Sequence, residues 1–382
     1  MTDYKAIAAN LIFPDKVLIE GVFQDAAGGE TFDTLNPANG EVLARIPACG
    51  ATDVEAAVAS ARRAFESGSW SGLHPSARKA ILLKLADLID ENTTELAVME
   101  ALDAGKPITD CVEIDIPDTA NCIRWHAEAQ DKLYDQIAPS APDAVGLIVR
   151  EPIGVVAAVL PWNFPLMMMA WKIGPALATG NSVIVKPAEQ TSLTALRLGA
   201  LALEAGVPPG VLNIVTGMGP DVGEPLGRHM DVDAVTFTGS TEVGKNFLVY
   251  SAESNAKEVC LEMGGKSAAV VLEDASDIPR IAEIQAGAIF WNMGENCTAN
   301  SRIIVHHTLY DALIAELEKQ AATWVVGDPL DPETQNGPLI SAEHMAKVSG
   351  LVETGKAQGA RVVCGGEAGE GLLFKPTIFA EV

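Results

Sequence analysis

Cysteines are few in this sequence, and none lies close to another. Of 382 residues only six are cysteine, and no Cys-x-x-Cys motif occurs. A disulfide framework is therefore not expected, which is typical of proteins from a reducing compartment.

Positive charge is also scarce. The 26 lysines and arginines are outnumbered by 51 aspartates and glutamates, so the formal net charge is −25. A chain with this balance repels nucleic-acid phosphates and anionic lipid surfaces. Neither nucleic acid nor a membrane is therefore expected as a partner.

No leader and no long apolar run can be seen. Residues 1–10 lack the basic region and apolar core of a signal peptide. The longest apolar stretch, residues 155–160, is too short to span a bilayer. The composition, 48% hydrophobic and 20% charged, is globular, and the length suits two or three domains. We therefore expect a cytoplasmic protein.

The histidines show no metal-ligand spacing, and no His-Glu-x-x-His motif occurs among the six of them. A metal site is therefore not expected. The lack of a convincing histidine partner for a cysteine also argues against a papain-like thiol hydrolase.

From residue 154 onward, short runs rich in valine and isoleucine alternate with helical segments. Strands are expected over residues 155–160, 182–185, 211–215, 234–237 and 268–272. Helices are expected over residues 52–67, 76–104, 192–205 and 277–291, the first with a capping box of Thr52 and Glu55. This alternation predicts an α/β fold with a Rossmann-like, doubly wound parallel sheet. Residues 131–150 break the rhythm and predict a linker or an exposed hairpin.

Two glycine-rich turns follow predicted strands. Gly217-x-Gly219-x-x-x-Gly223 is one residue off the dinucleotide fingerprint, and ordinary turn glycines explain it as well. Residues 239–244 form a strand–glycine–helix junction that aims backbone N–H groups at a phosphate. The same stretch partly matches a P-loop, but Asn246 stands where the magnesium-binding Ser or Thr should be. ATP binding by a P-loop is therefore not expected.

Cys297 and Glu262 are the residues most suited to covalent chemistry. A buried structural thiol is the ordinary interpretation of a cysteine. Cys297, however, lies in the polar stretch Asn292-Met-Gly-Glu-Asn-Cys297 behind an apolar run, where a thiolate can be both reached and stabilised. Glu262 stands at the edge of an apolar strand, where it is either a solvated carboxylate or a general base.

These pieces stand in an order that resembles the aldehyde dehydrogenase superfamily. The matching motifs are Pro161-Trp-Asn-Phe-Pro165, Lys186-Pro-Ala-Glu-Gln-Thr191, Phe237-Thr-Gly-Ser-Thr-Glu-Val-Gly244, Leu261-Glu-Met-Gly-Gly-Lys266 and Gly294-Glu-Asn-Cys297, with weaker support from Asn36-Pro37 and Leu102-Asp-Ala-Gly-Lys-Pro107. Together they extend over nearly the whole chain.

The resemblance implies a division of roles. Cys297 would attack the aldehyde carbon and form a thiohemiacetal. The side-chain amide of Asn163 and the backbone N–H of Cys297 would stabilise the oxyanion. After hydride transfer to the nicotinamide of NAD, Glu262 would activate the water that hydrolyses the thioester to the acid.

The resemblance also assigns the binding residues. Lys186 and Glu189 would bind the adenosine ribose, and the carboxylate favours NAD because it repels the extra phosphate of NADP. Gly239 and Ser240 would lie at the pyrophosphate, and Pro161 and Trp162 beside the cofactor. Phe164, Met168 and Trp171 would line the substrate tunnel, although their helical spacing fits core packing equally well.

The stretch Phe290-Trp-Asn-Met-Gly-Glu-Asn-Cys297-Thr is most similar to bacterial enzymes acting on ω-aminoaldehydes, including γ-glutamyl-γ-aminobutyraldehyde from polyamine degradation. Betaine aldehyde is the other substrate left open. The rival functions are a CoA-acylating dehydrogenase, which Glu262 disfavours, a non-catalytic relative, and a thiol esterase that needs no NAD.

The implied domains are an NAD-binding domain of residues 1–130 and 153–262, a bridging and oligomerisation segment of residues 131–152, and a catalytic domain of residues 263–382. In this family a Glu-Ile-Phe-Gly-Pro-like motif follows soon after the segment matching Pro376-Thr-Ile-Phe379, and its glutamate holds the nicotinamide ribose. The sequence ends at Val382, before that motif. We therefore expect a truncated catalytic domain, and a dimer or tetramer for the full-length form.

Overall fold

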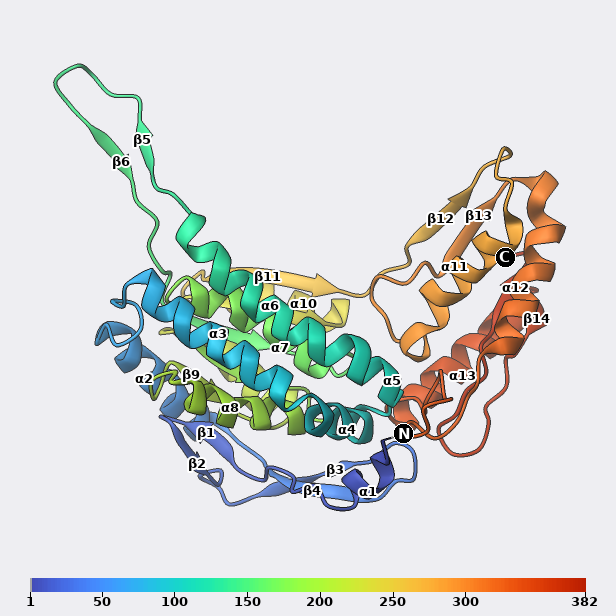
Figure 1. Cartoon of the computed structure of the whole chain (residues 1–382), viewed down its shortest axis with the longest axis horizontal. Coiled ribbons are helices and arrows are strands. Elements are labelled where there is room, and N and C mark those ends of the chain that lie inside the picture. The colour runs from blue at the N-terminus through green and yellow to red at the C-terminus, as the bar shows by residue number, and fades with distance from the viewer. Residues whose placement is uncertain (1) are drawn as a thin grey trace.

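The computed structural model describes residues 2–382 and shows a mixed α/β fold, which confirms the predicted class. Figure 1 shows a larger part built on a wide sheet, a smaller part formed by the last third of the chain, and a hairpin that projects away from both. Within residues 2–382, every helix is too short or too polar to traverse a lipid bilayer.

The wide sheet has seven strands and is mostly parallel. Their order across the sheet is β11 (Glu258–Met263), β10 (Ala234–Gly239), β7 (Val155–Val159), β8 (Ser182–Lys186), β9 (Leu212–Ile214), β1 (Val17–Ile19) and β2 (Val22–Gln24). Strands β7 to β11 pair in parallel, whereas β1 and β2 are antiparallel additions at one edge. The chain builds outward from β7 in one direction to β9 and then crosses to β10 on the other side. In such sheets a ligand crevice opens at this reversal, beyond the carboxyl ends of the strands.

Helices cover both faces of the sheet, as the period-two pattern of the strands requires. In β7, Val156 and Ala158 belong to one core, and Val155, Ala157 and Val159 belong to the other. The first core contains α3 (Pro75–Glu91), α4 (Thr93–Ala104), α6 (Ile116–Ala129), α7 (Pro165–Ala178) and α8 (Leu193–Ala205). The second contains α2 (Ala51–Glu66), α9 (Glu224–Arg228) and α10 (Thr241–Ala252).

Two of the predicted helix features are wrong in detail. The single helix expected over residues 76–104 is divided at Asn92, whose side-chain Nδ2 donates to the carbonyl of Leu88 at 2.7 Å and ends α3 before α4 begins. Helix α2 is not capped by Thr52 and Glu55. It begins at Ala51, and the Asp53 carboxylate accepts the backbone N–H of Gly50 at 3.0 Å, so the capping pattern lies two residues earlier.

The C-terminal part has its own small sheets and core. Strand β12 (Ala268–Val271) pairs in parallel with β13 (Arg302–Val305), and β14 (Arg361–Cys364) pairs antiparallel with β15 (Ile378–Ala380). Helices α11 (Ile278–Phe290) and α12 (Tyr310–Thr323) pack together beside β12, with Val271, Ala282 and Leu313 buried between them. Helix α13 (Ala342–Ala357) faces back toward the larger part (Figure 1).

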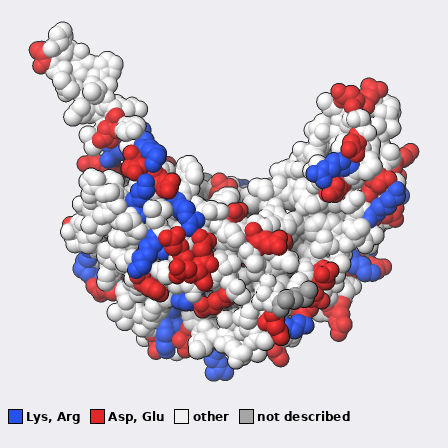
Figure 2. Space-filling model, in the orientation of Figure 1, with Lys and Arg blue, Asp and Glu red and all other residues white. Residues whose placement is uncertain are grey.

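The segment of residues 131–150 is an exposed hairpin of β5 (Gln136–Ala138) and β6 (Gly146–Ile148), one of the two predicted alternatives. Its large apolar side chains are in solvent, with Ile137 76% and Val145 77% exposed. Figure 2 shows almost no charge on this hairpin, whereas charged side chains crowd the surface below it. An apolar projection of this kind is typical of a surface that another protein covers.

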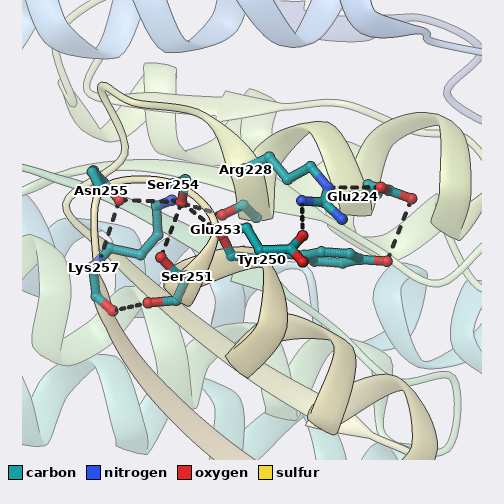
Figure 3. A network of polar contacts seen from close by, with 9 residues as sticks. Glu224, Arg228, Tyr250, Ser251, Glu253, Ser254, Asn255 and Lys257 are labelled. Carbon is teal, nitrogen blue, oxygen red and sulfur yellow. Dashed lines mark hydrogen bonds and ion pairs between the residues drawn. The ribbon is translucent and has the colours of Figure 1, made fainter.

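A polar network fixes α9 against the end of α10 (Figure 3). Arg228 pairs with Glu224 at 2.7 Å and Glu253 at 2.6 Å, and its guanidinium lies 4.5 Å from the ring centre of Tyr250. Below them the buried ammonium of Lys257 donates to the carbonyl of Gly227 at 2.6 Å. The exposed ion pairs are individually weak, so they contribute little to the stability of this region.

Candidate active site

A cavity of about 760 Å³ opens beyond the carboxyl ends of the central strands. Its lining includes the last residue of each of four strands: Val159 of β7, Lys186 of β8, Gly239 of β10 and Met263 of β11. The opposite wall comes from the C-terminal part. The cavity therefore lies between the two parts of the molecule, at the reversal of strand order where the fold favours a ligand.

Glycines let the backbone itself face this cavity. A Cβ at Gly219 or Gly264 would meet no atom within 4 Å, so both glycines border open space. Gly219 opens a single π turn of residues 219–223, which is the imperfect fingerprint of the sequence. A Cβ at Gly265 would lie 3.2 Å from the carbonyl oxygen of Cys297, so the loop before β12 passes close to the nucleophile segment.

One end of the cavity is polar and suited to a sugar and a phosphate. The buried ammonium of Lys186 pairs with Glu189 at 3.1 Å, and both side chains line the cavity. Ser240 caps α10, since its hydroxyl accepts the backbone N–H of Val243 at 3.2 Å. The N-terminus of this helix therefore opens into the same cavity as Lys186 and Glu189, and the unpaired N–H groups and dipole of such a terminus favour an anion.

Cys297 follows a segment with unusual backbone geometry. Asn292, Met293 and Gly294 all have left-handed φ values, 53°, 57° and 74°. Two of them are not glycine, and strain of this kind collects at functional sites. The thiol of Cys297 is half-buried and lines the cavity, whereas burial raises the pKa of Cys49 to about 12 and keeps it protonated.

Asn163 lies at the same place, on the loop between β7 and α7. Its side-chain Nδ2 donates to the carbonyl of Glu295 at 2.6 Å, and it lines the cavity together with Cys297. Its own carbonyl accepts from Asn292 Nδ2 at 3.0 Å and from Lys106 Nζ at 3.2 Å. The structure thus brings the predicted nucleophile and the predicted oxyanion donor to one wall.

Glu262 does not line the cavity. In β11 the exposed side chains of Cys260 and Glu262 alternate with Leu261, which packs into the α10-side core, so Glu262 lies on the α7 side of the sheet. There Lys172 donates to the hydroxyl of Thr238 at 2.7 Å. Burial lowers the pKa of Lys172 to about 8, and the nearby charge of Glu262 opposes that effect.

The three residues predicted to line the substrate tunnel do not all lie in the cavity. Phe164 and Met168 line the cavity and form an apolar cluster with Met167, against which Trp291 also packs. Trp171 is 55% exposed on the surface of α7 and does not line the cavity. Trp162 lines it from the adjoining loop, with its ring edge-on to His344 at 5.1 Å.

Sequence reasoning missed Glu295 and His344, which line the cavity, and Lys106 and Asn292, which donate to the carbonyl of Asn163. Glu295 is almost fully buried beside His344, whose Nε2 lies 3.4 Å from its carboxylate, and burial raises the pKa of Glu295 to about 8. Lys106 and Glu295 stand inside motifs that the sequence makes visible, but nothing local shows what they touch. His344 carries no such signal.

The raised pKa of Glu295 predicts a pH-dependent stability. An unfolded glutamate has a pKa near 4.3, so between about pH 4 and pH 8 the folded chain holds a proton that the unfolded chain releases. Stability is therefore greatest at the acidic end of this window and is lost as the pH rises through about 8. We expect the Tm to fall by about 5 °C between pH 5.5 and pH 8.5, as measured by calorimetry. The Glu295→Gln variant should show a shallower fall and exposed Glu353→Gln an unchanged one, and equal slopes for all three would contradict the assignment.

The fold and the cavity define a Rossmann-like α/β enzyme with an accessible thiol at the mouth of a dinucleotide-type crevice. The chain belongs to the aldehyde dehydrogenase family, whose family model matches residues 23–382. An aminoacetaldehyde dehydrogenase of Pseudomonas aeruginosa is 54% identical over 376 residues, which are 98% of this chain and 76% of that protein.

Solved structures agree over the whole chain. An indole-3-acetaldehyde dehydrogenase in complex with NAD⁺ is 47% identical and superposes with a TM-score of 0.98, covering 100% of this chain and 78% of the other. A γ-glutamyl-γ-aminobutyraldehyde dehydrogenase from Burkholderia cenocepacia is 49% identical with a TM-score of 0.97, covering 99% and 77%.

Proposed function

We propose that this chain is an NAD-dependent aldehyde dehydrogenase that oxidises an ω-aminoaldehyde to its carboxylic acid. The observation that carries the proposal is the joint position of Cys297 and Asn163 on the wall of a cavity that Lys186 and Glu189 also line. A thiol, an oxyanion donor and a nucleotide-binding end therefore share one space.

In this proposal Cys297 attacks the aldehyde carbon and forms a thiohemiacetal. The amide nitrogen of Asn163 carries two hydrogens, and the carbonyl of Glu295 takes one of them. The second hydrogen and the backbone N–H of Cys297 stabilise the oxyanion. NAD, when bound, supplies the acceptor for the hydride that leaves this carbon, and an acyl thioester remains on Cys297.

Glu262 then activates the water that hydrolyses the thioester. Its exposed place outside the cofactor cavity supports this role, because the carboxylate is not occupied by the nucleotide site and water can reach it. Trp171, also outside the cavity, is exposed on α7 and would lie at an aldehyde entrance, whereas Phe164 and Met168 would contact the aldehyde from the cavity wall.

The cavity fits a dinucleotide. Lys186 and Glu189 would hold the adenosine ribose, and Gly239 and Ser240 at the start of α10 would hold the pyrophosphate. The adjoining walls include Pro161 and Trp162. The open space at Gly219 and Gly264 leaves the backbone free to approach a ligand closely.

Cofactor choice can be tested at Glu189. A carboxylate at the ribose repels the extra phosphate of NADP, so the Glu189→Thr variant should raise the ratio of kcat/KM for NADP to that for NAD about 10-fold. The measurement is initial NADH and NADPH formation at varied cofactor concentration. Glu343→Gln removes another carboxylate that lines the cavity from α13 and should leave the ratio unchanged. An unaltered ratio in Glu189→Thr would remove this residue from the ribose site.

The proposed substrate class rests on the relatives, which include an aminoacetaldehyde and a γ-glutamyl-γ-aminobutyraldehyde dehydrogenase. The net charge of −25 suits a cationic aldehyde, and a role in polyamine degradation follows from that class. Residues 1–130 and 153–262 would bind NAD, and residues 263–382 would carry the nucleophile. The apolar hairpin of β5 and β6 would join copies of the chain into a homo-oligomer, and the unpaired cysteines fit a cytoplasmic location.

Acid-quench mass spectrometry of the intact chain tests the function. The chain is mixed with NAD and an aminoaldehyde, stopped within milliseconds, weighed and mapped by peptide. We expect an acyl adduct on Cys297 that appears only when both reagents are present, together with NADH absorbance at steady state. An adduct formed without NAD would indicate simple addition of the thiol to the aldehyde instead, and the absence of both adduct and NADH would reject dehydrogenase activity for this chain.

A further inference from the structure

Lys106 is a buried lysine that reaches the site from outside the catalytic segment. It lies in the turn after α4, between Gly105, whose left-handed φ of 75° ends the helix, and Pro107. Only 1% of its surface is exposed. Its ammonium lies 3.9 Å from the ring centre of Phe164 and 3.2 Å from the carbonyl oxygen of Asn163. The charge is therefore placed against the loop that carries the proposed oxyanion donor.

The ammonium stays charged because acidic groups surround it. Asp115, on the short π-helix η1 (Cys111–Asp115), is fully buried and pairs with Lys106 at 2.9 Å. Burial lowers the pKa of Lys106, but the charges of Asp115 and Glu100 outweigh burial and leave the pKa raised. A buried ion pair is a weak source of stability, since packed apolar side chains often serve as well. Because the ammonium of Lys106 also contacts the loop of Asn163, its charge can act on the active site.

Three contacts fix Asn163, and they come from two distant segments. Its carbonyl accepts from Lys106 on one side and from Asn292 on the other. Its side-chain amide donates to the carbonyl of Glu295. Asn292 and Glu295 both belong to the segment before Cys297, so Lys106 supplies the one contact from the larger part of the molecule. Without it, Asn292 would be the remaining hydrogen-bond partner of the Asn163 carbonyl among the described residues.

We propose that Lys106 is a positioning residue, whose ammonium holds the Asn163 peptide so that the side-chain amide stays aimed at the oxygen of an aldehyde bound to Cys297. This inference rests on the proposed function. It adds to that function a residue other than the nucleophile Cys297, the oxyanion donor Asn163 and the base Glu262. Lys106 contacts neither substrate nor cofactor in this role; it acts through Asn163 alone.

The Lys106→Met variant of the full chain tests the proposal. Removing one oxyanion donor typically costs 10²- to 10³-fold in rate, and a displaced donor keeps part of its effect, so hydride transfer should slow about 10- to 100-fold in stopped-flow measurements of NADH. Alkylation of Cys297 by iodoacetamide develops no oxyanion and should change less than about twofold. A parallel loss of alkylation would mean that the whole site has collapsed and would overturn the positioning role.

A double-mutant cycle with Asn163→Ala identifies the path of the effect. If Lys106 acts through Asn163, the Lys106→Met change should slow hydride transfer no further in the Asn163→Ala background. Multiplicative losses would show that Lys106 acts elsewhere. Lys257→Met is the matched control, because this buried ammonium also donates to a backbone carbonyl, but in the network of Figure 3. It should lower the Tm and leave the rate of hydride transfer unchanged.

Removing Lys106 leaves the Asp115 charge unpaired, so Lys106→Met with Asp115→Asn provides a neutral version that avoids this folding penalty. This double variant should be more stable than Lys106→Met but should transfer hydride equally slowly. A crystal structure of either variant should show Asn163 turned from the carbonyl of Glu295. An unmoved Asn163 would overturn the proposal by itself, whatever the kinetic measurements show. An unmutated chain that forms no NADH contradicts the proposed function, whereas an active chain indifferent to Lys106→Met contradicts only this inference.

Discussion

The Cys297→Ala variant is expected to lose NAD-dependent aldehyde oxidation almost completely, with kcat/KM reduced at least about 10⁴-fold. Without the thiol no thiohemiacetal forms, so the hydride cannot leave a tetrahedral carbon and no thioester follows. The side chain is half-buried and small, and the loop around it is held by Asn292 and Asn163, so the fold should persist. NADH formation at 340 nm measures the loss.

Two controls make the Cys297 result specific. Cys364→Ala removes a thiol of similar burial in β14, away from the cavity, and should retain activity. NAD affinity of Cys297→Ala, measured by calorimetry, should stay within about threefold of that of the parent chain, because Lys186, Glu189 and Ser240, which would hold the cofactor, are unchanged. Retained oxidation in Cys297→Ala would eliminate covalent catalysis by this residue.

The Glu262→Gln variant is expected to separate the two halves of the reaction. A general base contributes typically 10²- to 10⁴-fold, so steady-state turnover should fall about 10³-fold. The first hydride transfer precedes hydrolysis of the thioester and therefore does not need this base. We therefore expect a burst of NADH equal to the concentration of Cys297, followed by a very slow phase, and an acyl adduct that persists in the intact mass.

Glu258→Gln provides the control for Glu262. Both carboxylates are exposed in β11, four residues apart on one face of the strand, so the two changes are chemically equal. Only Glu262 lies beside the carboxyl-terminal half of β10, paired with Thr238, whereas Glu258 is paired with Ala234 at the start of that strand. Glu258→Gln should retain full turnover. Loss of the burst together with the steady rate in Glu262→Gln would assign this carboxylate an earlier step than hydrolysis.

Local patterns predicted much of the fold because the forces behind them are local. Strands β7 and β8 are short, apolar on both faces and bounded by glycine, asparagine or proline, as a central parallel strand must be. For β11 only an apolar strand with Glu262 at its edge was expected, without bounds, since an edge strand with Glu258, Cys260 and Glu262 on its open face lacks a continuous apolar run. The division at Asn92 was missed because the helical pattern continues through it, and only a side chain bonding back to Leu88 ends the first helix.

The sequence by itself determined the α/β class, the family resemblance and the residues fit for covalent chemistry, because these depend on residue type, spacing and order. Tertiary structure alone decided that Glu262 lies on the α7 side of the sheet, outside the cavity that Cys297 and Asn163 line, and that Lys106 contacts the Asn163 loop. Lys106 and Asn163 are 57 residues apart, and Asn163 and Glu295 are 132 apart. Contacts over such separations form only when packing closes the intervening chain, so no local pattern records them.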